Sequence, residues 1–198
     1  MADAADIRPA RKSDATAMAA LVDIAGHGLP AYMWSRMKEP GQSVLEFGRA
    51  RAARDTGAFS WRNAHVLEAG GEVAALLVDY PLDDPYVIGD LNEMPDFIHP
   101  MVRLEAQAPG SWYVNVVAAF PEFRGKGFGA RLLALSEDRA RAGNIATMSI
   151  IVAGENSGAV RLYSRTGYRE VGREPVVEFP GCPHGGDWVL MTKELTHG

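Results

Sequence analysis

Hydrophobic and polar residues follow one another along the chain with two different periods. Apolar residues spaced three or four positions apart, with polar residues between them, predict helices. The first helix follows Ser13 and Asp14, residue types that favour a helix N-terminus, and ends near Gly26. The helices predicted in this way cover residues 14–25, about 44–53, from the glycine-rich segment at 124–129 to about 142, and 156–165.

Shorter runs of β-branched, aromatic and aliphatic residues predict strands. Two of these runs flank Gly70 and Gly71, and this arrangement predicts a hairpin. The predicted strands cover residues 6–10, 65–68, 72–80, 111–119, 147–152, 167–171 and 188–195. In the second half of the chain strands and helices alternate, which is typical of an α/β fold. The glycine-rich segment lies at one of the strand-to-helix turns.

Residues 81–110 follow neither period. The segment contains five prolines and several acidic residues. A long irregular segment inside a compact domain is usually either functional or disordered. Scattered large apolar residues indicate that this segment packs against the rest of the protein, and a short helix is expected near residues 96–105.

Composition narrows the classes of function. A chain of 198 residues, 47% hydrophobic and 23% charged, is expected to form a single domain over 1–198. A net charge of −5 argues against a nucleic-acid partner. The apolar runs are too short to span a bilayer and the acidic N-terminus does not resemble a signal peptide, so a cytoplasmic protein with no membrane partner is expected. The single cysteine, Cys182, forms no internal disulfide, and together with His184 it supplies too few ligands for a structural zinc, so no metal is expected.

The most informative segment is Arg124-Gly125-Lys126-Gly127-Phe128-Gly129. Glycine at alternate positions allows positive φ and close approach of the backbone to a ligand. The helix that follows presents its unpaired N–H groups, and with two cationic side chains beside them this favours phosphate or pyrophosphate. A P-loop requires Gly-Lys-Ser or Gly-Lys-Thr, and a dinucleotide fingerprint requires Gly-x-Gly-x-x-Gly, so both alternatives fail. By itself the cluster fits a purely structural turn equally well.

The wider sequence around this turn resembles a known family. The stretch from residue 116 to 133, VVAAFPEFRGKGFGARLL, resembles the coenzyme-A-binding core of the GNAT superfamily of N-acetyltransferases. Its signature, [Gln/Arg]-x-x-Gly-x-[Gly/Ala], is matched by Arg124, Gly127 and Gly129. Residues 156–168 resemble the family's later Asn…Ala…Leu-Tyr…Gly-[Phe/Tyr] segment. The resemblance implies an α/β GNAT fold, with a central mixed, mostly antiparallel sheet that is splayed in the middle and has helices on both faces.

The resemblance also implies a reaction. Acetyl-CoA would be the acyl donor, and a primary amine of a small molecule or peptide would attack it directly in a ternary complex. Tyr163 would be the general acid and the backbone N–H of Val117 the oxyanion donor. Asn156 would bind the cofactor arm or cap the helix that follows it. The implied cofactor-binding residues are Val116, Val117, Ala118, Arg124, Gly125, Lys126, Gly127, Phe128, Gly129, Ala130, Asn156 and Tyr163.

The sequence offers several candidates for the general base. Asp90, Glu93, His99 and Glu105 lie in or near the irregular segment, and each is more often a solvated surface group than a catalytic one. We carry Glu105 forward as the candidate base, with an ordered water as the alternative. Tyr86 is expected to be a core residue.

Three further expectations concern the acceptor and the partners. Tyr32 and Trp34 are placed in a loop between two helices that borders the acceptor pocket in the family. The frequent pairing of family members favours a homodimer. Two other functions fit part of the pattern: a non-catalytic acyl-CoA sensor would keep the turn without turnover, and a structural α/β protein would bind no cofactor.

Overall fold

The computed structural model describes residues 5–183 and 185–196. The chain forms two compact units. The first consists of the chain up to Asp79 together with Val116–Leu133, and the second of Tyr80–Asn115 together with the chain from Ala134 onward.

In the first unit three strands pair in the order of the chain. β1 (Asp6–Pro9) is antiparallel to β2 (Ala64–Ala69), which is antiparallel to β3 (Glu72–Pro81). The β2–β3 connection confirms the predicted hairpin. The apolar residues in the middle of β2 and β3 are fully buried, so both strands contribute to the core of this unit. An ion-pair network joins β1 to the start of the first helix: the Arg8 guanidinium contacts Asp14 at 2.7 Å and Glu68 at 2.6 Å.

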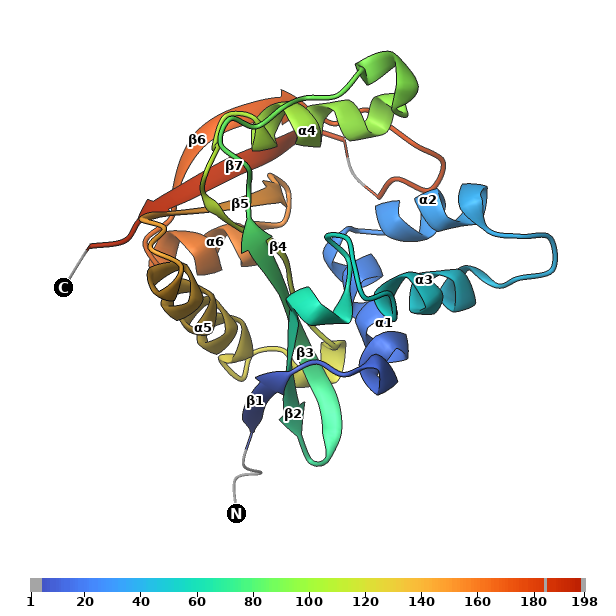
Figure 1. The fold of residues 1–198 in the computed structure, drawn as a ribbon, viewed down its shortest axis with the longest axis horizontal. Coiled ribbons are helices and arrows are strands. Elements are labelled where there is room, and N and C mark those ends of the chain that lie inside the picture. Colours follow the sequence, from blue (N-terminus) through green and yellow to red (C-terminus); the bar gives the residue numbers. More distant parts are fainter. Residues whose placement is uncertain (1–4, 184, 197–198) are drawn as a thin grey trace. The chain divides into compact units, whose positions relative to one another are not determined.

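Three helices complete this unit: α1 (Ala15–Ala25), α2 (Leu29–Met37) and α3 (Val44–Ala52). Figure 1 shows them side by side, and α3 contacts both of the others. Helix α3 begins at a capping box, in which the Ser43 hydroxyl accepts from the Glu46 N–H and the Glu46 carboxylate accepts from the Ser43 N–H. The predictions for α1 and α3 are therefore confirmed.

The expected loop around Tyr32 and Trp34 is wrong, because both residues lie within α2. The glycines at 26 and 28 predict the end of the first helix and a loop after it. Gly28 instead takes a left-handed conformation (φ 85°) and caps the start of a new helix. A proline in the first turn of α2 is compatible with this, because its missing N–H has no intrahelical partner there. The buried ring of Trp34 lies directly over Gly48 of α3, where a Cβ atom would come within 2.4 Å of the ring.

The second unit is built on strands from the C-terminal half of the chain. β5 (Thr147–Ala153) pairs antiparallel with β7 (Asp187–Glu194), and β7 pairs antiparallel with β6 (Arg169–Pro175). Helix α4 (His99–Glu105) packs on β6, β7 and β5. Helix α6 (Ser157–Arg165) follows β5, and α5 (Phe128–Ala142) begins in the first unit and ends in the second. The short helix expected near residues 96–105 is confirmed by α4 and by the 3-10 turn at Asp96–Ile98 that precedes it.

One strand, β4 (Trp112–Ala119), belongs to both units. Its first half pairs parallel with β5 in the second unit, and at its end the Phe120 N–H donates to the Ala74 carbonyl of β3 in the first. The strand order is β1-β2-β3-β4-β5-β7-β6. Over the described residues, the mixed seven-stranded sheet and its six α-helices confirm the predicted fold class. Across the described part of the chain, no helix has the length and apolar character needed to cross a membrane.

Candidate functional site

The glycine-rich turn lies in the first unit, between a 3-10 turn at Pro121–Phe123 and helix α5. Gly125 and Gly127 have φ of 76° and 78°. A Cβ atom built on either glycine would meet nothing within 4 Å, so neither glycine is required by close packing against the protein. The left-handed backbone explains their identity, and the space beside them is open to a ligand.

Helix α5 begins immediately after these glycines. The Gly127 carbonyl accepts from the Arg131 N–H at 3.2 Å, so Gly127 is the residue at which the helical hydrogen bonding starts. The N–H groups of Phe128, Gly129 and Ala130 are therefore in the first turn, where no carbonyl of the same helix can accept from them. The Phe128 side chain is buried and anchors this turn to the unit. The result is a row of backbone donors at the positive end of the helix dipole, which favours an anion.

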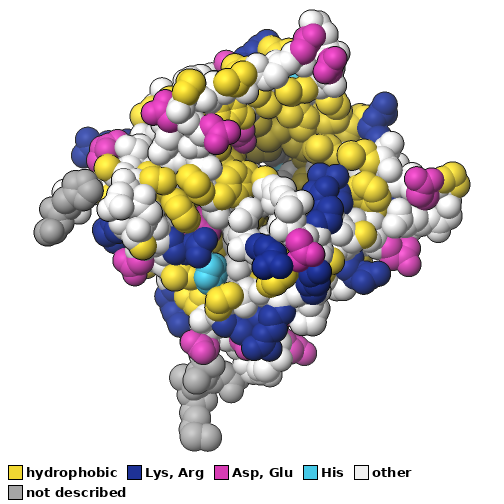
Figure 2. Space-filling view, viewed as in Figure 1, with side chains coloured by type: hydrophobic (Ala, Val, Ile, Leu, Met, Phe, Trp, Pro, Cys, Tyr) yellow, Lys and Arg dark blue, Asp and Glu magenta, His cyan; other side chains and the backbone are white. Residues whose placement is uncertain are grey.

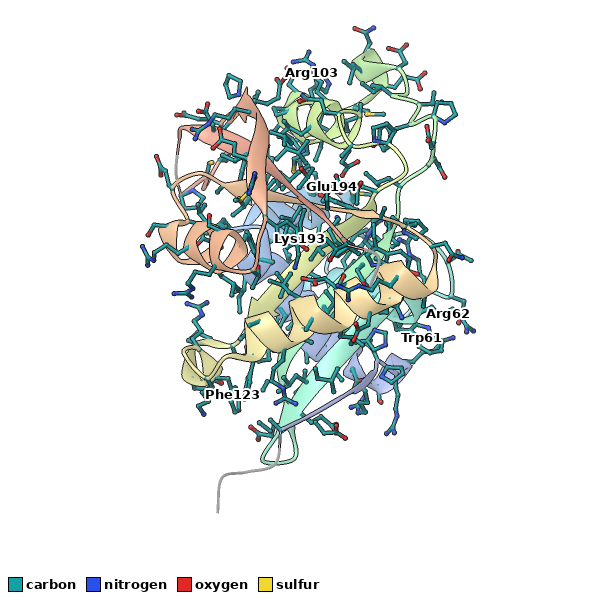
Figure 3. All side chains as sticks on the ribbon, turned by 90° about the vertical axis from the view of Figure 1, so that its left-hand side faces the viewer. Trp61, Arg62, Arg103, Phe123, Lys193 and Glu194 are labelled. Carbon is teal, nitrogen blue, oxygen red and sulfur yellow. The ribbon has the colours of Figure 1, made fainter. Side chains whose placement is uncertain are left out.

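Two cations flank the turn and both are exposed. The Lys126 ammonium lies 4.9 Å from the centre of the Phe123 ring, on the loop that leads into α5 (Figure 3). The Arg124 guanidinium donates to the Ala119 carbonyl at 3.3 Å. Each side chain is thus held near the turn by a weak local contact, and its charge faces solvent.

The strand before the turn supplies the predicted backbone groups. Val116 is buried, whereas Val117 and Ala118 are half-buried. The ladder between β4 and β5 covers three residues of β4, Trp112–Val114. The backbone N–H and C=O groups of Val116–Ala118 lie beyond the end of that ladder. The cofactor-binding residues predicted at 116–118 and 124–130 therefore all belong to the first unit.

Asn156 and Tyr163 are in the second unit, on helix α6. The Asn156 carboxamide oxygen accepts from the Ala159 N–H at 3.1 Å and caps the helix, as one of the two predicted roles required. Tyr163 is buried, with its ring 6.1 Å from the ring of Tyr168. Burial raises the pKa of the Tyr163 phenol above its usual value of 10.0, so this group remains a neutral O–H donor at neutral pH.

Glu105, the candidate base, lies at the end of α4 and is hydrogen-bonded to two tyrosines of the same unit. The Tyr86 hydroxyl donates to its carboxylate, and so does the Tyr113 hydroxyl. Burial raises the pKa of the Glu105 carboxyl, and the two phenol hydrogen bonds oppose this shift without cancelling it. Such a carboxylate is more basic than an exposed one.

The cluster around Glu105 extends by two more residues. The ring of Tyr80 meets the ring of Tyr113 edge-on at 5.8 Å. Asn115, which is exposed on β4, hydrogen-bonds the Tyr113 oxygen from its side chain. We call Tyr80, Tyr86, Glu105, Tyr113 and Asn115 the tyrosine–carboxylate cluster.

The other candidate bases have different environments. The Asp90 carboxylate accepts from the Asn92 N–H at 2.8 Å and caps a 3-10 turn, and Glu93 is exposed in that turn. His99 Nε2 lies 3.0 Å from the Met94 carbonyl oxygen, which can only accept, so this nitrogen carries a hydrogen. Cys182 lies in a loop, and His184 lies outside the described residues. No cluster of three histidine, cysteine or acidic side chains in the described ranges could hold a metal ion.

Sequence reasoning missed the phenols of the tyrosine–carboxylate cluster. Tyr86 was assigned to the core, but its hydroxyl contacts Glu105 and part of its side chain is accessible. The two tyrosines that reach Glu105 come from positions 19 residues before it and eight residues after it. No single periodicity links these positions, because the chain between them passes through irregular turns, helix α4 and the start of β4.

Comparison with known proteins gives consistent matches. The family model described as "Acetyltransferase (GNAT) family" matches residues 31–168. Among solved structures, one acetyltransferase is 24% identical, with 96% of this chain and 100% of that chain covered and a TM-score of 0.67. No curated protein matches the chain.

Two further solved structures share the fold. A putative acetyltransferase from Salmonella typhimurium, solved with its cofactor acetyl-CoA, is 20% identical over 98% of this chain and 96% of that chain, with a TM-score of 0.58. A polyamine N-acetyltransferase from Drosophila melanogaster, which catalyses the formation of N-acetylagmatine, is 17% identical over 97% of this chain and 100% of that chain, with a TM-score of 0.66.

Proposed function

The chain belongs to the acetyltransferase (GNAT) family, and on this premise we propose that it transfers the acetyl group of acetyl-CoA to a primary amine. The acceptor is a small molecule or a peptide, and the amine attacks the thioester directly in a ternary complex. The similar solved structures include one with acetyl-CoA bound and a polyamine N-acetyltransferase that forms N-acetylagmatine, which supports this choice of donor and acceptor.

The observation that carries the proposal is the open glycine turn before α5. Gly125 and Gly127 have positive φ with nothing beside them, and the first-turn N–H groups of the helix follow. The pyrophosphate of acetyl-CoA fits such a turn because its oxygens accept from backbone N–H groups without any particular side chain. Residues 124–130 and the Asn156 side chain are the proposed cofactor contacts in addition to 116–118.

Chemistry at the thioester needs an oxyanion donor and an acid. The Val117 N–H is the proposed donor, since it lies beyond the β4–β5 ladder and so is not used by that pairing. Tyr163 is the proposed general acid: its phenol stays protonated near neutral pH and can give its hydrogen to the leaving thiolate. Glu105 is the proposed base that removes a proton from the incoming ammonium.

Thiol release from acetyl-CoA, followed over a panel of amines, tests the proposal. We expect amine-dependent release of free coenzyme A and a saturable rise in Tm with acetyl-CoA, because a ligand that binds only the folded state stabilises it. A rise in Tm without thiol release from any amine would favour the sensor alternative. The absence of any shift would overturn the proposal and leave the structural alternative.

A further inference from the structure

Negative charge is concentrated in the irregular segment at 81–110. This segment contains six acidic residues and one arginine, so it alone accounts for the net charge of −5 of the entire chain. In Figure 2, acidic side chains gather on the light-green tip of this segment as drawn in Figure 1. The single arginine, Arg103, is turned to β6, where it pairs with Glu174 at 3.6 Å (Figure 3). The segment therefore carries excess negative charge, and its single cation is already paired with a carboxylate. Such a charge distribution favours the approach of a cation over that of an anion.

Aromatic rings surround the one carboxylate of this segment that is largely withdrawn from water. Glu105 accepts from the hydroxyls of Tyr86 and Tyr113, so two of its lone pairs are oriented and the others remain available. Tyr80, Tyr86 and Glu105 each keep part of their side chain accessible. A carboxylate fixed in direction, beside accessible phenol rings, is the arrangement that binds an organic ammonium through an ion pair and cation–π contacts.

We propose that the tyrosine–carboxylate cluster selects acceptors that arrive as alkylammonium cations, and that Tyr86 and Tyr113 are positioning residues for Glu105. This inference rests on the proposed acetyl transfer and specifies its acceptor class. Aliphatic amines, which are protonated at neutral pH, are substrates. Aromatic amines, which are neutral at that pH, make neither the ion pair nor the cation–π contact and are poor substrates.

The proton balance fits this assignment. The ammonium gives one proton to a Glu105 oxygen, and the freed nitrogen lone pair then forms a bond to the thioester carbon. When the carbon–sulfur bond breaks, the sulfur takes its electron pair and receives the hydrogen of Tyr163. The nitrogen of the new amide loses its second proton, which restores the phenol through solvent. Glu105 finally releases its proton, so that one proton leaves for each amide formed.

Three tyrosines and one aspartate are titratable groups around Glu105. Tyr80 comes from β3, Tyr86 from the irregular segment and Tyr113 from β4, and all three have pKa values raised chiefly by burial. Asp83 lies near enough to Tyr86 to raise its pKa further. The three phenols stay neutral from acid pH to neutral pH, so Glu105 is the member of the tyrosine–carboxylate cluster whose ionisation changes over that range.

A pair of isomeric amines tests the inference. Benzylamine is an ammonium near pH 7, whereas p-toluidine has the same atoms and is neutral. For Glu105→Gln we expect kcat/KM for benzylamine to fall about 100-fold, the usual contribution of a positioned proton acceptor, and for p-toluidine to change less than about threefold. Asp96→Asn is the matched control: it removes one charge from the same segment at a side chain that is 87% exposed, and it should leave both values unchanged. An equal loss with both amines would overturn the inference.

The positioning role has its own signature in the pH profile. Removing the hydroxyl in Tyr86→Phe deletes a hydrogen bond that lowers the pKa of Glu105, so that pKa rises further. The acid limb of kcat/KM for benzylamine should then move to higher pH, with the plateau at high pH nearly retained. A purely structural role would lower the whole profile without moving its limb, and that result would overturn the assignment.

Binding without turnover separates this inference from the proposed function. Saturation-transfer NMR of the wild type with coenzyme A, which carries no acetyl group, should show benzylamine bound and p-toluidine unbound, and Glu105→Gln should lose the benzylamine signal. If the wild type releases no thiol but shows this selectivity, acetyl transfer is overturned and the cation site is supported. If it acetylates both amines equally well and binds them alike, acetyl transfer stands and the cation site is overturned.

Discussion

The glycine turn at 124–129 and the tyrosine–carboxylate cluster reach selectivity by opposite means. The turn offers backbone N–H groups and an open space, and its two cationic side chains, Arg124 and Lys126, are exposed and held by weak contacts. The cluster is made of side chains that come from β3, the irregular segment, α4 and β4, held by hydrogen bonds between them. A ligand that all members of a family share can be bound by backbone geometry, which requires few residue types. An acceptor that differs between members requires side chains.

The largest effect should come from filling the open space of the turn. Gly127→Val puts a β-branched residue at φ 78°, where it is strained, and fills the position a phosphate oxygen would occupy. We expect the Kd for acetyl-CoA, measured by calorimetry, to rise at least about 100-fold, or about 2.7 kcal/mol.

The control for this change is Gly71→Val in the β2–β3 hairpin. Gly71 has φ 82°, belongs to the same unit and also has nothing within 4 Å of a Cβ atom. Both variants therefore carry similar backbone strain, but we expect Gly71→Val to bind acetyl-CoA as the wild type does. An equal loss in both would mean that strain, and not the site, determines the affinity.

The second largest effect should come from removing the hydroxyl of Tyr163, the proposed general acid in the second unit. Tyr163→Phe keeps the buried ring and removes the hydroxyl, so kcat should fall about 100-fold while KM for acetyl-CoA changes less than about twofold. Tyr168→Phe makes the same change in the neighbouring ring and should retain most of kcat. A similar fall in kcat for both variants would point to packing of the ring pair and would contradict the assignment of Tyr163 as acid.

The glycine turn and the tyrosine–carboxylate cluster also differ in how far the sequence predicts them. The turn could be predicted because positive φ strongly favours glycine, so this backbone geometry is visible in the sequence as closely spaced glycines. Helix α2 was missed because Gly28 and the proline after it also fit a loop, and only the packing of Trp34 on Gly48 decides between the two. The tyrosine–carboxylate cluster could not be predicted, because Tyr86 and Tyr113 meet Glu105 through the folding of an irregular segment that has no period.

A smaller effect separates two roles of Asn156. Asn156→Asp keeps the oxygen that accepts from the Ala159 N–H, so the cap and the stability should be retained, while the amide hydrogens of the proposed contact to the cofactor arm are lost. We expect the Kd for acetyl-CoA to rise about fivefold with unchanged Tm. Asn156→Ala should in addition lower the free energy of unfolding by about 1 kcal/mol. Unchanged affinity in the aspartate variant would leave capping as its role.

The smallest effect should follow from removing a charge beside the turn. Lys126 is exposed and its ammonium lies beside the Phe123 ring, so solvent and salt screen its attraction to a phosphate. We expect Lys126→Ala to raise the Kd for acetyl-CoA about threefold near 0.05 M salt, and the difference from the wild type to vanish near 0.5 M. Lys12→Ala, which removes an exposed lysine paired with Asp55 in the same unit, should show no such difference. A large, salt-independent loss in Lys126→Ala would instead mean that a side chain, and not the backbone, dominates anion binding at the turn. The glycine turn would then bind its ligand through side chains, as the tyrosine–carboxylate cluster does, and the difference between the two regions would be contradicted.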